Sequence, residues 1–343
     1  MIKPKRLKPG DTIAVLSPSA GAAQRFPHVF DKGLSALRNV FGFRIKEFPT
    51  ARMSSAELHD DPRKRAEDIN AAFADKEIDG IICSIGGDDS IRILQYLDLE
   101  LIRENHKFIM GYSDSTTFLG YLNLNGLVTY YGSSVMAGFG YIENFDEAVE
   151  EYKRVLFTDL PYRIAPFASW ADAYKNWGVP ENAGKVAEIR NDDVGFRWLQ
   201  KGSVTEGRLW GGCIEVLDMM NGTFAWPSAE FWNGRILMIE TSEDKPTPTY
   251  VGYILRNFGI QGILPKLKGI LIARPKAYSS NEKLELDQEI IKIVVGEFEC
   301  RELNIIANIE FGHTDPRHIL PLGVSMRIDP AKEELLFTEQ LFV

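Results

Sequence analysis

The chain has 343 residues, 45% of them hydrophobic and 25% charged, which is typical of a globular protein and excludes a disordered or collagen-like one. At roughly 100–200 residues per domain, this length predicts two domains. With 39 Lys and Arg against 48 Asp and Glu, the formal charge of −9 argues against binding to nucleic-acid polymers or anionic membranes. The 3 Cys cannot build a disulfide framework, and the 5 His leave few candidates for a catalytic base.

The first part of the chain alternates short apolar runs with helical spacing, which predicts a parallel sheet between helices. Strands are expected at Thr12–Leu16, Phe43–Phe48, Ile78–Ile85, Phe108–Gly111 and Leu127–Tyr130. Helices are expected around Phe30–Val40, after Pro62, and at Ser90–Leu97 and Phe118–Leu124. Ligands bind beyond the carboxyl ends of such strands, so three turns are of interest: Ser17–Gly21, Gly86–Ser90 and Tyr112–Thr116.

The apolar run near the N-terminus, Ile13–Leu16, is too short for a signal peptide or a membrane helix, so a cytoplasmic protein is expected. Residues 165–203 have little periodicity and are expected to form a long connection in which Trp170 and Trp177 are exposed or half-exposed.

A second apolar pattern starts at Gly207. It predicts strands at Ile236–Ile239, Gly269–Ala273 and Asn304–Ile309, helices at Tyr250–Asn257 and Leu284–Glu297, and a terminal hairpin of Val324–Ile328 and Leu335–Thr338. The predicted organisation is an N-terminal α/β domain over residues 1–165, a tryptophan-containing connecting loop over 166–203 and a C-terminal domain over 204–343.

Ser113 lies in the motif Gly111-Tyr112-Ser113-Asp114-Ser115-Thr116, between a predicted strand and a predicted helix. A serine at such a turn projects its hydroxyl above the sheet edge, and the free N–H groups of the following helix can stabilise an oxyanion. The alternative is that Ser113, Asp114 or Ser115 only caps the helix.

A second turn, Ile85-Gly86-Gly87-Asp88-Asp89-Ser90, follows another strand. Its glycines let a group approach the backbone closely and could donate a second oxyanion N–H. Two alternatives remain: a phosphate-binding turn in which an Asp serves Mg²⁺, as in some phosphoryl-transfer enzymes, and a plain tight turn with Asp88 or Asp89 as a cap. The chain contains neither G-x-G-x-x-G nor G-x-x-x-x-G-K-[ST], which excludes the usual dinucleotide and P-loop motifs.

Glu240 ends the apolar run Ile236–Ile239, where a carboxylate is expected to be partly buried and to need a partner. Glu243 and Asp244 follow in a polar turn and are expected to be solvated. His313 comes after the strand Asn304–Ile309, beside a glycine, a placement that presents a side chain to a site; the alternative is a surface-loop histidine.

The other four histidines have less favourable contexts: His28, His59, His106 and His318. Only His313 and His318 are spaced like a metal-binding pair, and no cysteine lies near them, so no metal site is expected.

Taken together in chain order, these motifs resemble the serine LD-carboxypeptidase family, and the resemblance covers nearly the whole chain. It rests on Pro18-Ser19, IGGDDS at 85–90, GYSDST at 111–116, WGGCIEVL at 210–217, ILMIE at 236–240 and GHTDP…LPLG at 312–323. It implies an α/β fold, with an N-terminal flavodoxin-like parallel-sheet domain and a smaller C-terminal domain that has a barrel-like mixed sheet. It further implies a site between the domains and a homodimer.

The same resemblance implies roles for individual residues. Ser113 matches the nucleophile, His313 the general base and Glu240 the residue that orients the base. The N–H groups of Gly87, next to Gly86, and of Asp114 match the oxyanion hole. The implied reaction is hydrolysis of an amide bond through an acyl-enzyme, with no metal or cofactor.

Two branches of this family imply different substrates. One removes a terminal D-alanine from peptidoglycan-derived peptides, and the other, the microcin C immunity branch, cuts the linkage between an aminoacyl group and a nucleotide. This chain is more similar to the second branch, whose stacking loop on the nucleotide base is similar to the segment with Trp170 and Trp177. The alternative for both rings is packing between domains. Gly86 and Arg274 are further predicted substrate-binding residues.

Two departures from the family pattern bear on the substrate. Cys213 stands where the family often has Asn, and Lys276 falls near a position where the immunity branch has Glu. The expected partners are a small peptide or an aminoacyl-nucleotide and a second copy of the chain, not a nucleic-acid polymer or a membrane. A non-catalytic two-domain protein that binds a small ligand is the alternative from another class, but it gives no reason for Ser113, Glu240 and His313 together.

Overall fold

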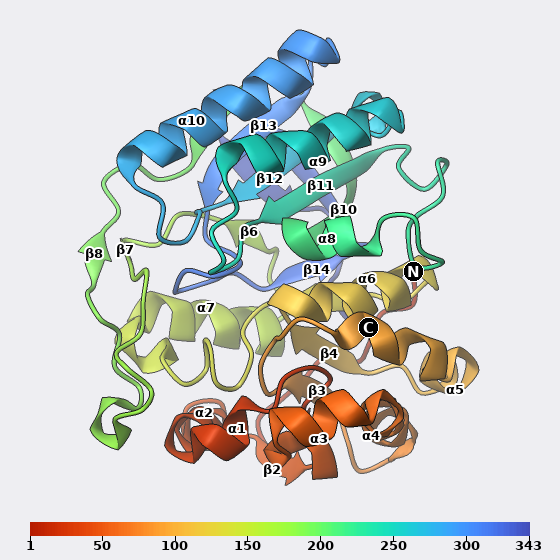
Figure 1. Cartoon of the computed structure of the whole chain (residues 1–343), viewed down its shortest axis with the longest axis vertical. Coiled ribbons are helices and arrows are strands. Elements are labelled where there is room, and N and C mark those ends of the chain that lie inside the picture. The colour runs from red at the N-terminus through yellow and green to blue at the C-terminus, as the bar shows by residue number, and fades with distance from the viewer.

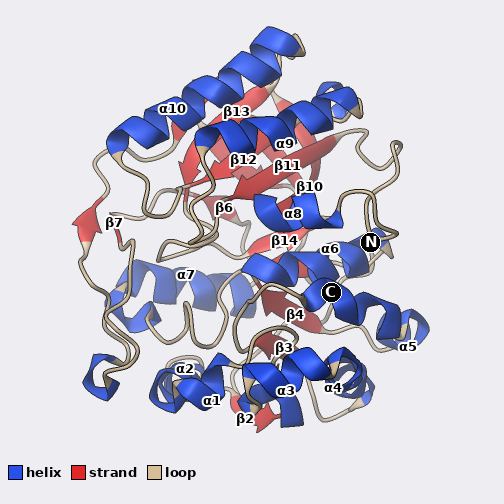
Figure 2. Ribbon diagram, viewed as in Figure 1, coloured by secondary structure: helices blue, strands red, loops and turns tan.

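A computed structural model describes all 343 residues. The elements form two main sheets, the first built mostly from the N-terminal half and the second mostly from the C-terminal half (Figure 1). Helices flank both sheets (Figure 2). The two chain ends are hydrogen-bonded to each other, because the N–H of Val343 donates to the carbonyl of Pro4 at 3.0 Å. No helix is both long enough and apolar enough to cross a membrane.

The first sheet contains five parallel strands in the order β2-β1-β3-β4-β5, and β14 joins the β5 edge antiparallel. This is the flavodoxin-like order, in which the direction of strand addition reverses between β1 and β3. The central strands are continuous apolar runs buried on both faces, as expected for a sheet between helices. The strands are β1 (Thr12–Leu16), β2 (Arg44–Glu47), β3 (Gly80–Cys83), β4 (Phe108–Gly111), β5 (Thr129–Tyr131) and β14 (Leu320–Leu322).

Local sequence signals explain the helices around this sheet. Asp61 caps α4 by accepting a hydrogen bond from the N–H of Lys64 at 3.2 Å, and Pro62 occupies the first turn, so the helix predicted after Pro62 is confirmed. The predicted helix near Ser90 is a 3₁₀ helix, Ser90–Tyr96; Ile91, Leu94 and the C-terminal flanking residue Leu97 recur at every third position, which fits three residues per turn. The α-helices are α1 (Ala22–Arg25), α2 (Pro27–Asn39), α3 (Ser55–Asp60), α4 (Pro62–Ala74), α5 (Leu99–Glu104), α6 (Thr116–Leu124) and α7 (Asp146–Phe157).

The second sheet is mixed and curls into a half-barrel, with the strand order β6-β16-β15-β10-β11-β12-β13-β9. Its centre, β10 to β13, is parallel, and its outer strands are antiparallel. The strands are β6 (Arg163–Ile164), β9 (Arg197–Gln200), β10 (Thr205–Cys213), β11 (Arg235–Glu240), β12 (Gly269–Ala273), β13 (Asn304–Ile309), β15 (Ser325–Asp329) and β16 (Glu334–Phe337). The helices are α8 (Ile214–Met220), α9 (Pro248–Ile260) and α10 (Ser280–Ile291), which continues into a π-helical turn, Lys292–Glu297.

The two sheets are not independent of each other. β14 comes from the C-terminal part but completes the first sheet, and β6 precedes the connection but pairs with β16 of the second. One continuous apolar core runs through both. The predicted fold class is therefore confirmed, while the division at 1–165, 166–203 and 204–343 stays a prediction.

The connection over 166–203 is partly structured. β7 (Ser169–Trp170) and β8 (Arg190–Asn191) form a short ribbon at the side of the molecule (Figure 1), and β9 pairs with β13. The expectation that both tryptophans are exposed or half-exposed is wrong for Trp170, which is 8% exposed. The guanidinium of Arg274 lies 4.5 Å from its ring centre. That partner comes from a segment about a hundred residues away, so local periodicity could not reveal it. Trp177 is half-buried.

Candidate active site

Three turns meet beyond the ends of β1, β3 and β4, next to the point where the strand order reverses. The carbonyl of Gly86 accepts a hydrogen bond from the N–H of Ala20 at 3.0 Å, which joins the first turn to the second. A Cβ atom on Gly86 would lie 2.9 Å from the Cβ of Ser113, so only glycine lets the third turn pack this closely. The sheet edge singled out from the sequence is where these polar turns gather.

Ser113 starts a 3₁₀ turn, Ser113–Ser115, that leads into α6, and its φ is 61°. This left-handed conformation costs a non-glycine residue about 1–2 kcal/mol. The side chain of Ser113 is half-exposed, and no side chain of the motif makes a capping bond to α6. The alternative that the motif only caps the helix is therefore wrong.

His313 connects Ser113 to Glu240. Its Nε2 lies 3.1 Å from the Oγ of Ser113, and its Nδ1 lies 2.7 Å from Oε2 of Glu240. The other carboxylate oxygen, Oε1, accepts a hydrogen bond from the hydroxyl of Tyr131 at 2.6 Å. A hydroxyl, an imidazole and a carboxylate in this order can activate the serine for nucleophilic attack.

Glu240 and His313 come from the second sheet and its loops. Glu240 is the last residue of β11 and is 2% exposed, so its predicted burial and its need for a partner are confirmed. Gly312 has a φ of 82°, and a Cβ there would lie 2.5 Å from Oε2 of Glu240. Glycine at this position therefore allows the His313 loop to reach the carboxylate. The N–H of His318 donates to the carbonyl of Glu310 at 2.7 Å, which closes the base of the loop.

A second carboxylate contacts the imidazole. Oε2 of Glu243 lies 2.9 Å from Nε2 of His313, the nitrogen that also faces Ser113. Burial lowers the pKa of His313, but the charges of Glu240 and Glu243 outweigh it and raise the pKa to about 9. The contact with His313 lowers the pKa of Glu243 to about 2. The two carboxylates in this arrangement thus favour the charged form of the imidazole.

The turn that carries Gly87 is fixed beside Ser113 by the carboxylate of Asp114. This buried carboxylate accepts hydrogen bonds from Ser19 Oγ at 2.5 Å and from the N–H of Ser90 at 2.8 Å. Burial raises the pKa of Asp114. The backbone N–H groups of Gly87 and Asp114 donate no hydrogen bond within the chain. Two free donors thus lie in turns that pack against Ser113.

In the Gly86–Ser90 turn, Asp89 is not available as a ligand for a metal ion. Asp89 is bound by Arg65 at 2.6 Å and by Arg92 at 2.9 Å, so its oxygens already have cationic partners. No group of three or more His, Cys, Asp or Glu side chains is placed to hold a metal ion. The phosphoryl-transfer alternative, which needs Mg²⁺ at this turn, therefore has no support here.

Arg274 lies against the ring of Trp170 and also binds the loop that carries His313. Arg274 is 3% exposed and pairs with Asp192 at 2.8 Å and with Glu310 at 2.9 Å. Because Asp192 lies in the connection and Glu310 in the His313 loop, this cluster joins the two segments. The predicted contact of Arg274 and Trp170 with a substrate stays a prediction.

Trp177 is linked to the His313 loop through Tyr174. The two rings stack with centroids 5.9 Å apart, and the Tyr174 hydroxyl donates to Asp315 at 2.5 Å. Lys276 lies between this stack and the catalytic candidates. Its Nζ is 5.5 Å from the centre of the Tyr174 ring and donates to the carbonyl of His313 at 3.2 Å.

Two residues of this arrangement were not selected from the sequence. Glu243 was expected to be solvated, and it is 65% exposed, yet its carboxylate reaches His313. Tyr131 lies one residue beyond the strand predicted at Leu127–Tyr130 and ends β5 in the structure. A polar aromatic residue at the carboxyl end of a parallel strand, next to the strand that precedes Ser113, is the signal that could have found it. Cys213, the departure from the family pattern, is buried and donates its N–H to Thr116 Oγ1 at 3.0 Å.

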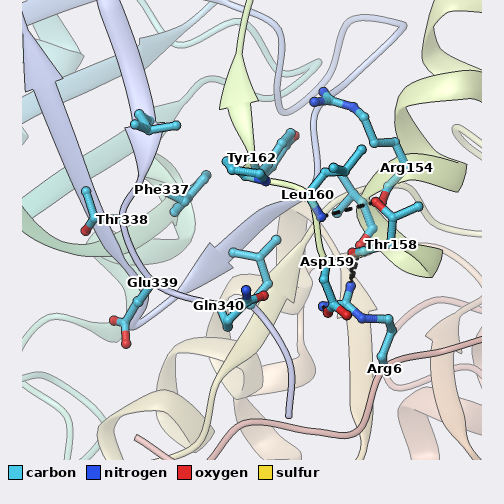
Figure 3. Close-up of a pocket in the computed structure, with 14 residues that line it drawn as sticks. Arg6, Arg154, Thr158, Asp159, Leu160, Tyr162, Phe337, Thr338, Glu339 and Gln340 are labelled. Carbon is cyan, nitrogen blue, oxygen red and sulfur yellow. Dashed lines mark hydrogen bonds and ion pairs between the residues drawn. The ribbon is translucent and has the colours of Figure 1, made fainter.

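Another cavity, of about 400 Å³, lies away from these residues (Figure 3). It is lined by Arg6, the end of α7, the segment after it, the end of β16 and the residues that follow β16, and none of Ser113, Glu240 and His313 contributes to it. The guanidinium of Arg6 donates to the carbonyl of Thr158 and pairs with Asp159, so its charge is satisfied within the protein (Figure 3).

Comparisons with known proteins give a consistent picture. Residues 13–132 match the LD-carboxypeptidase N-terminal domain, and residues 206–328 match the LD-carboxypeptidase C-terminal domain. The microcin self-immunity protein MccF of Escherichia coli is 26% identical over 96% of this chain and 94% of its own length. A Bacillus subtilis protein named as a probable murein peptide carboxypeptidase is 24% identical over 96% of this chain and 92% of its own length.

Solved structures agree in fold over almost the entire chain. A MccF-like protein from Streptococcus pneumoniae in complex with AMP has a TM-score of 0.84 and 28% identity, covering 96% of this chain and 98% of its own. MccF in complex with aspartyl sulfamoyl adenosine has a TM-score of 0.87 and 25% identity, with full coverage of both chains.

Proposed function

Because the chain belongs to the LD-carboxypeptidase family, a family of peptidases, we propose that it is a serine-type carboxypeptidase with Ser113 as nucleophile, His313 as general base and Glu240 as the residue that orients the base. The observation that carries the proposal is the hydrogen-bonded row in which His313 lies 3.1 Å from Ser113 Oγ and 2.7 Å from Glu240. Ser113 comes from the N-terminal half of the chain, and Glu240 and His313 come from the C-terminal half. Contacts between neighbours in the sequence therefore do not account for this row.

In the proposed reaction, Nε2 of His313 takes the proton from Ser113 Oγ as the oxygen attacks the carbonyl carbon of the scissile amide. The resulting Nε2–H then protonates the leaving nitrogen, and the C–N bond breaks to give an acyl-enzyme on Ser113. Water, deprotonated by the same nitrogen, then attacks the acyl carbon. The bond between this carbon and Ser113 Oγ breaks as His313 returns the proton to Oγ, which releases the acid and restores the serine. Glu240 holds the Nδ1–H throughout and stabilises the imidazolium that forms.

The developing oxyanion is assigned to the N–H groups of Gly87 and Asp114. Both donors are free and belong to turns that the Asp114 carboxylate holds together through Ser90. Donors fixed before the reaction stabilise the transition state without reorganisation, and loss of one typically costs about 10²–10³ in rate. The reaction needs no metal ion or cofactor.

The proposed substrates are aminoacyl-nucleotide compounds or peptidoglycan-derived peptides. The first class is supported by the aspartyl sulfamoyl adenosine complex of MccF, and the second by the murein peptide carboxypeptidase relative. The stacked pair of Trp177 and Tyr174, joined to the His313 loop through Asp315, supports binding of a flat ring. The ammonium of Lys276 beside it supports an anionic group on the leaving side, which both substrate classes carry.

A substrate panel tests the proposal. Purified protein is incubated with a muramoyl tetrapeptide and with an aminoacyl sulfamoyl adenosine, and the products are separated by chromatography. Hydrolysis of at least one compound that is lost in Ser113→Ala supports the proposal. Unchanged hydrolysis by Ser113→Ala contradicts the assigned nucleophile, and binding of both compounds without hydrolysis favours the non-catalytic alternative.

A further inference from the structure

Tyr131 contacts both Ser113 and Glu240 of the proposed triad. It is the last residue of β5, pairs in register with Gly111 at the end of β4, and is completely buried. Its hydroxyl accepts a hydrogen bond from the N–H of Ser113 at 2.9 Å and donates one to Oε1 of Glu240 at 2.6 Å. One oxygen atom thus contacts the backbone of the nucleophile and the carboxylate that orients the base.

The direction of these two bonds is fixed by chemistry. An ionised carboxylate can only accept, so the single phenolic hydrogen points to Glu240. The phenolic oxygen then receives the N–H of Ser113. Burial raises the pKa of Tyr131 well above its ordinary value, which keeps this hydrogen in place.

Together with the triad, these bonds form a closed ring. In this ring the Ser113 N–H donates to Tyr131, and the Tyr131 hydroxyl donates to Oε1 of Glu240. The Nδ1–H of His313 donates to Oε2 of Glu240, and Nε2 of His313 contacts Ser113 Oγ. Two donors, the Tyr131 hydroxyl and the His313 Nδ1–H, converge on the Glu240 carboxylate, and hydrogen bonds coupled in a buried site polarise and fix one another. The ring therefore begins and ends on the same serine.

Ser113 and Glu240, the two residues that Tyr131 contacts, each depend on a neighbouring group that stabilises their conformation. Ser113 has a φ of 61°, a conformation that persists in a non-glycine residue only when its surroundings enforce it. Glu240 is 2% exposed, and without Tyr131 its Oε1 would have no donor. A phenol that satisfies both groups sets the serine backbone and the carboxylate plane relative to each other.

We propose that Tyr131 is a positioning residue that aligns Ser113 with the Glu240–His313 pair through this ring of hydrogen bonds. The inference rests on the proposed function, and it extends the alignment to a residue that does not touch the substrate. Because a displacement of about 1 Å in a reacting group can cost about 100-fold in rate, loss of the phenolic hydroxyl is expected to lower kcat about 10- to 100-fold with little change in KM.

Tyr130 provides a matched control on the same strand. It is equally buried, and its hydroxyl donates to the carbonyl of Leu341 at 2.7 Å, away from the triad. Tyr130→Phe removes one buried phenolic hydrogen bond and Tyr131→Phe removes two, so both are expected to lower the melting temperature. Only Tyr131→Phe is expected to slow hydrolysis and the labelling of Ser113 by a fluorophosphonate.

A spectroscopic readout separates this inference from the proposed function. The His313 Nδ1–H bonded to Glu240 should give a low-field proton resonance, identified by its loss in Glu240→Gln, whether or not a substrate is found. Tyr131→Phe should move it downfield, because Glu240 keeps more charge on Oε2. Tyr131→3-fluorotyrosine, a stronger donor that preserves the fold, should move it upfield. Tyr130→Phe should leave it in place.

Equal labelling rates and an unmoved resonance in Tyr131→Phe and Tyr130→Phe would overturn the inference. If Tyr131→Phe does not fold, the fluorotyrosine variant decides, and an unmoved resonance there overturns it as well. A moved resonance in a protein that hydrolyses neither substrate class would support the positioning role while contradicting the proposed function.

Discussion

Two histidines of the same loop, His313 and His318, share their electrostatic surroundings but not their neighbours. Each imidazole lies between two carboxylates, Glu240 and Glu243 for the first and Glu151 and Glu310 for the second. At both, burial lowers the pKa, and the carboxylates outweigh this and raise it to about 9.

The difference lies in what the second ring nitrogen faces. Nε2 of His313 lies 3.1 Å from the hydroxyl of Ser113, whereas Nε2 of His318 faces Glu310 at 3.6 Å. The ring of His318 stacks on Phe167 with centroids 4.5 Å apart and is fully buried. A raised histidine pKa thus marks a buried, paired imidazole, and only an adjacent nucleophile gives it a place in a reaction.

The largest expected difference between the two sites follows from removing each imidazole. His313→Asn should lower kcat about 10,000-fold, because the proposed general base is lost. His318→Asn should retain kcat within a few-fold, although both variants should melt at a lower temperature than the parent protein. Steady-state kinetics on the best substrate of the panel, with melting curves for folding, makes the comparison. Equal losses of kcat would show that the two histidines do not differ in the way described.

Neutralising Glu240, whose carboxylate binds Nδ1 of His313, should have the next largest effect on kcat. Glu240→Gln should lower kcat about 100- to 10,000-fold, because an amide neither stabilises the imidazolium nor fixes the tautomer. The matched variant Glu151→Gln makes the same chemical change next to His318 and should leave kcat nearly unchanged. A comparable loss in both variants would contradict a catalytic difference between the sites.

Removing the second carboxylate should increase activity. Glu243 shares Nε2 of His313 with Ser113 and helps to hold the imidazole in its charged form, which cannot accept a proton. Glu243→Gln should therefore lower the pKa of His313 and move the acid limb of the pH–kcat/KM profile to lower pH. At pH 7 the expected gain is several-fold, and Glu77→Gln, at an exposed carboxylate beside Lys46, serves as the control. An unmoved acid limb would mean that Glu243 does not influence the base.

The smallest expected effect is on stability. Each histidine has a pKa of about 9 when folded and an ordinary value of 6.5, so its contribution is complete below pH 6.5 and is lost as pH rises to about 9. The unfolding free energy should fall over this range, by less in His318→Asn than in the parent protein. Urea denaturation at pH 6 and pH 9 measures it, and a stability that rises with pH would contradict the pairing.

Structural features that depend on residues close together in the sequence could be predicted from the sequence alone. Residues 108–111 and 304–309 are short apolar runs, and both form strands with the expected limits. The turn at Ser113 could also be placed from sequence, because a strand end, a glycine and a helix start lie within a few residues of each other.

Long-range packing could not be predicted in this way. The burial of Trp170 depends on Arg274, and the reach of Glu243 to His313 depends on how β11 and β13 are placed in the second sheet. Tyr131 contacts Glu240 from another sheet, and a single sequence does not encode that pairing in any spacing. Side chains of this kind become visible only when the two halves of the fold are assembled.

The central claim is that Ser113 becomes acylated, and intact-protein mass spectrometry with peptide mapping tests it most directly. Protein mixed with an aminoacyl sulfamoyl adenosine or a muramoyl tetrapeptide is quenched in acid during turnover. The predicted result is a mass gain equal to the acyl group, located on the peptide that contains Ser113 and absent in Ser113→Ala. Turnover with no adduct on that peptide, together with undiminished activity of Ser113→Ala, would contradict the account.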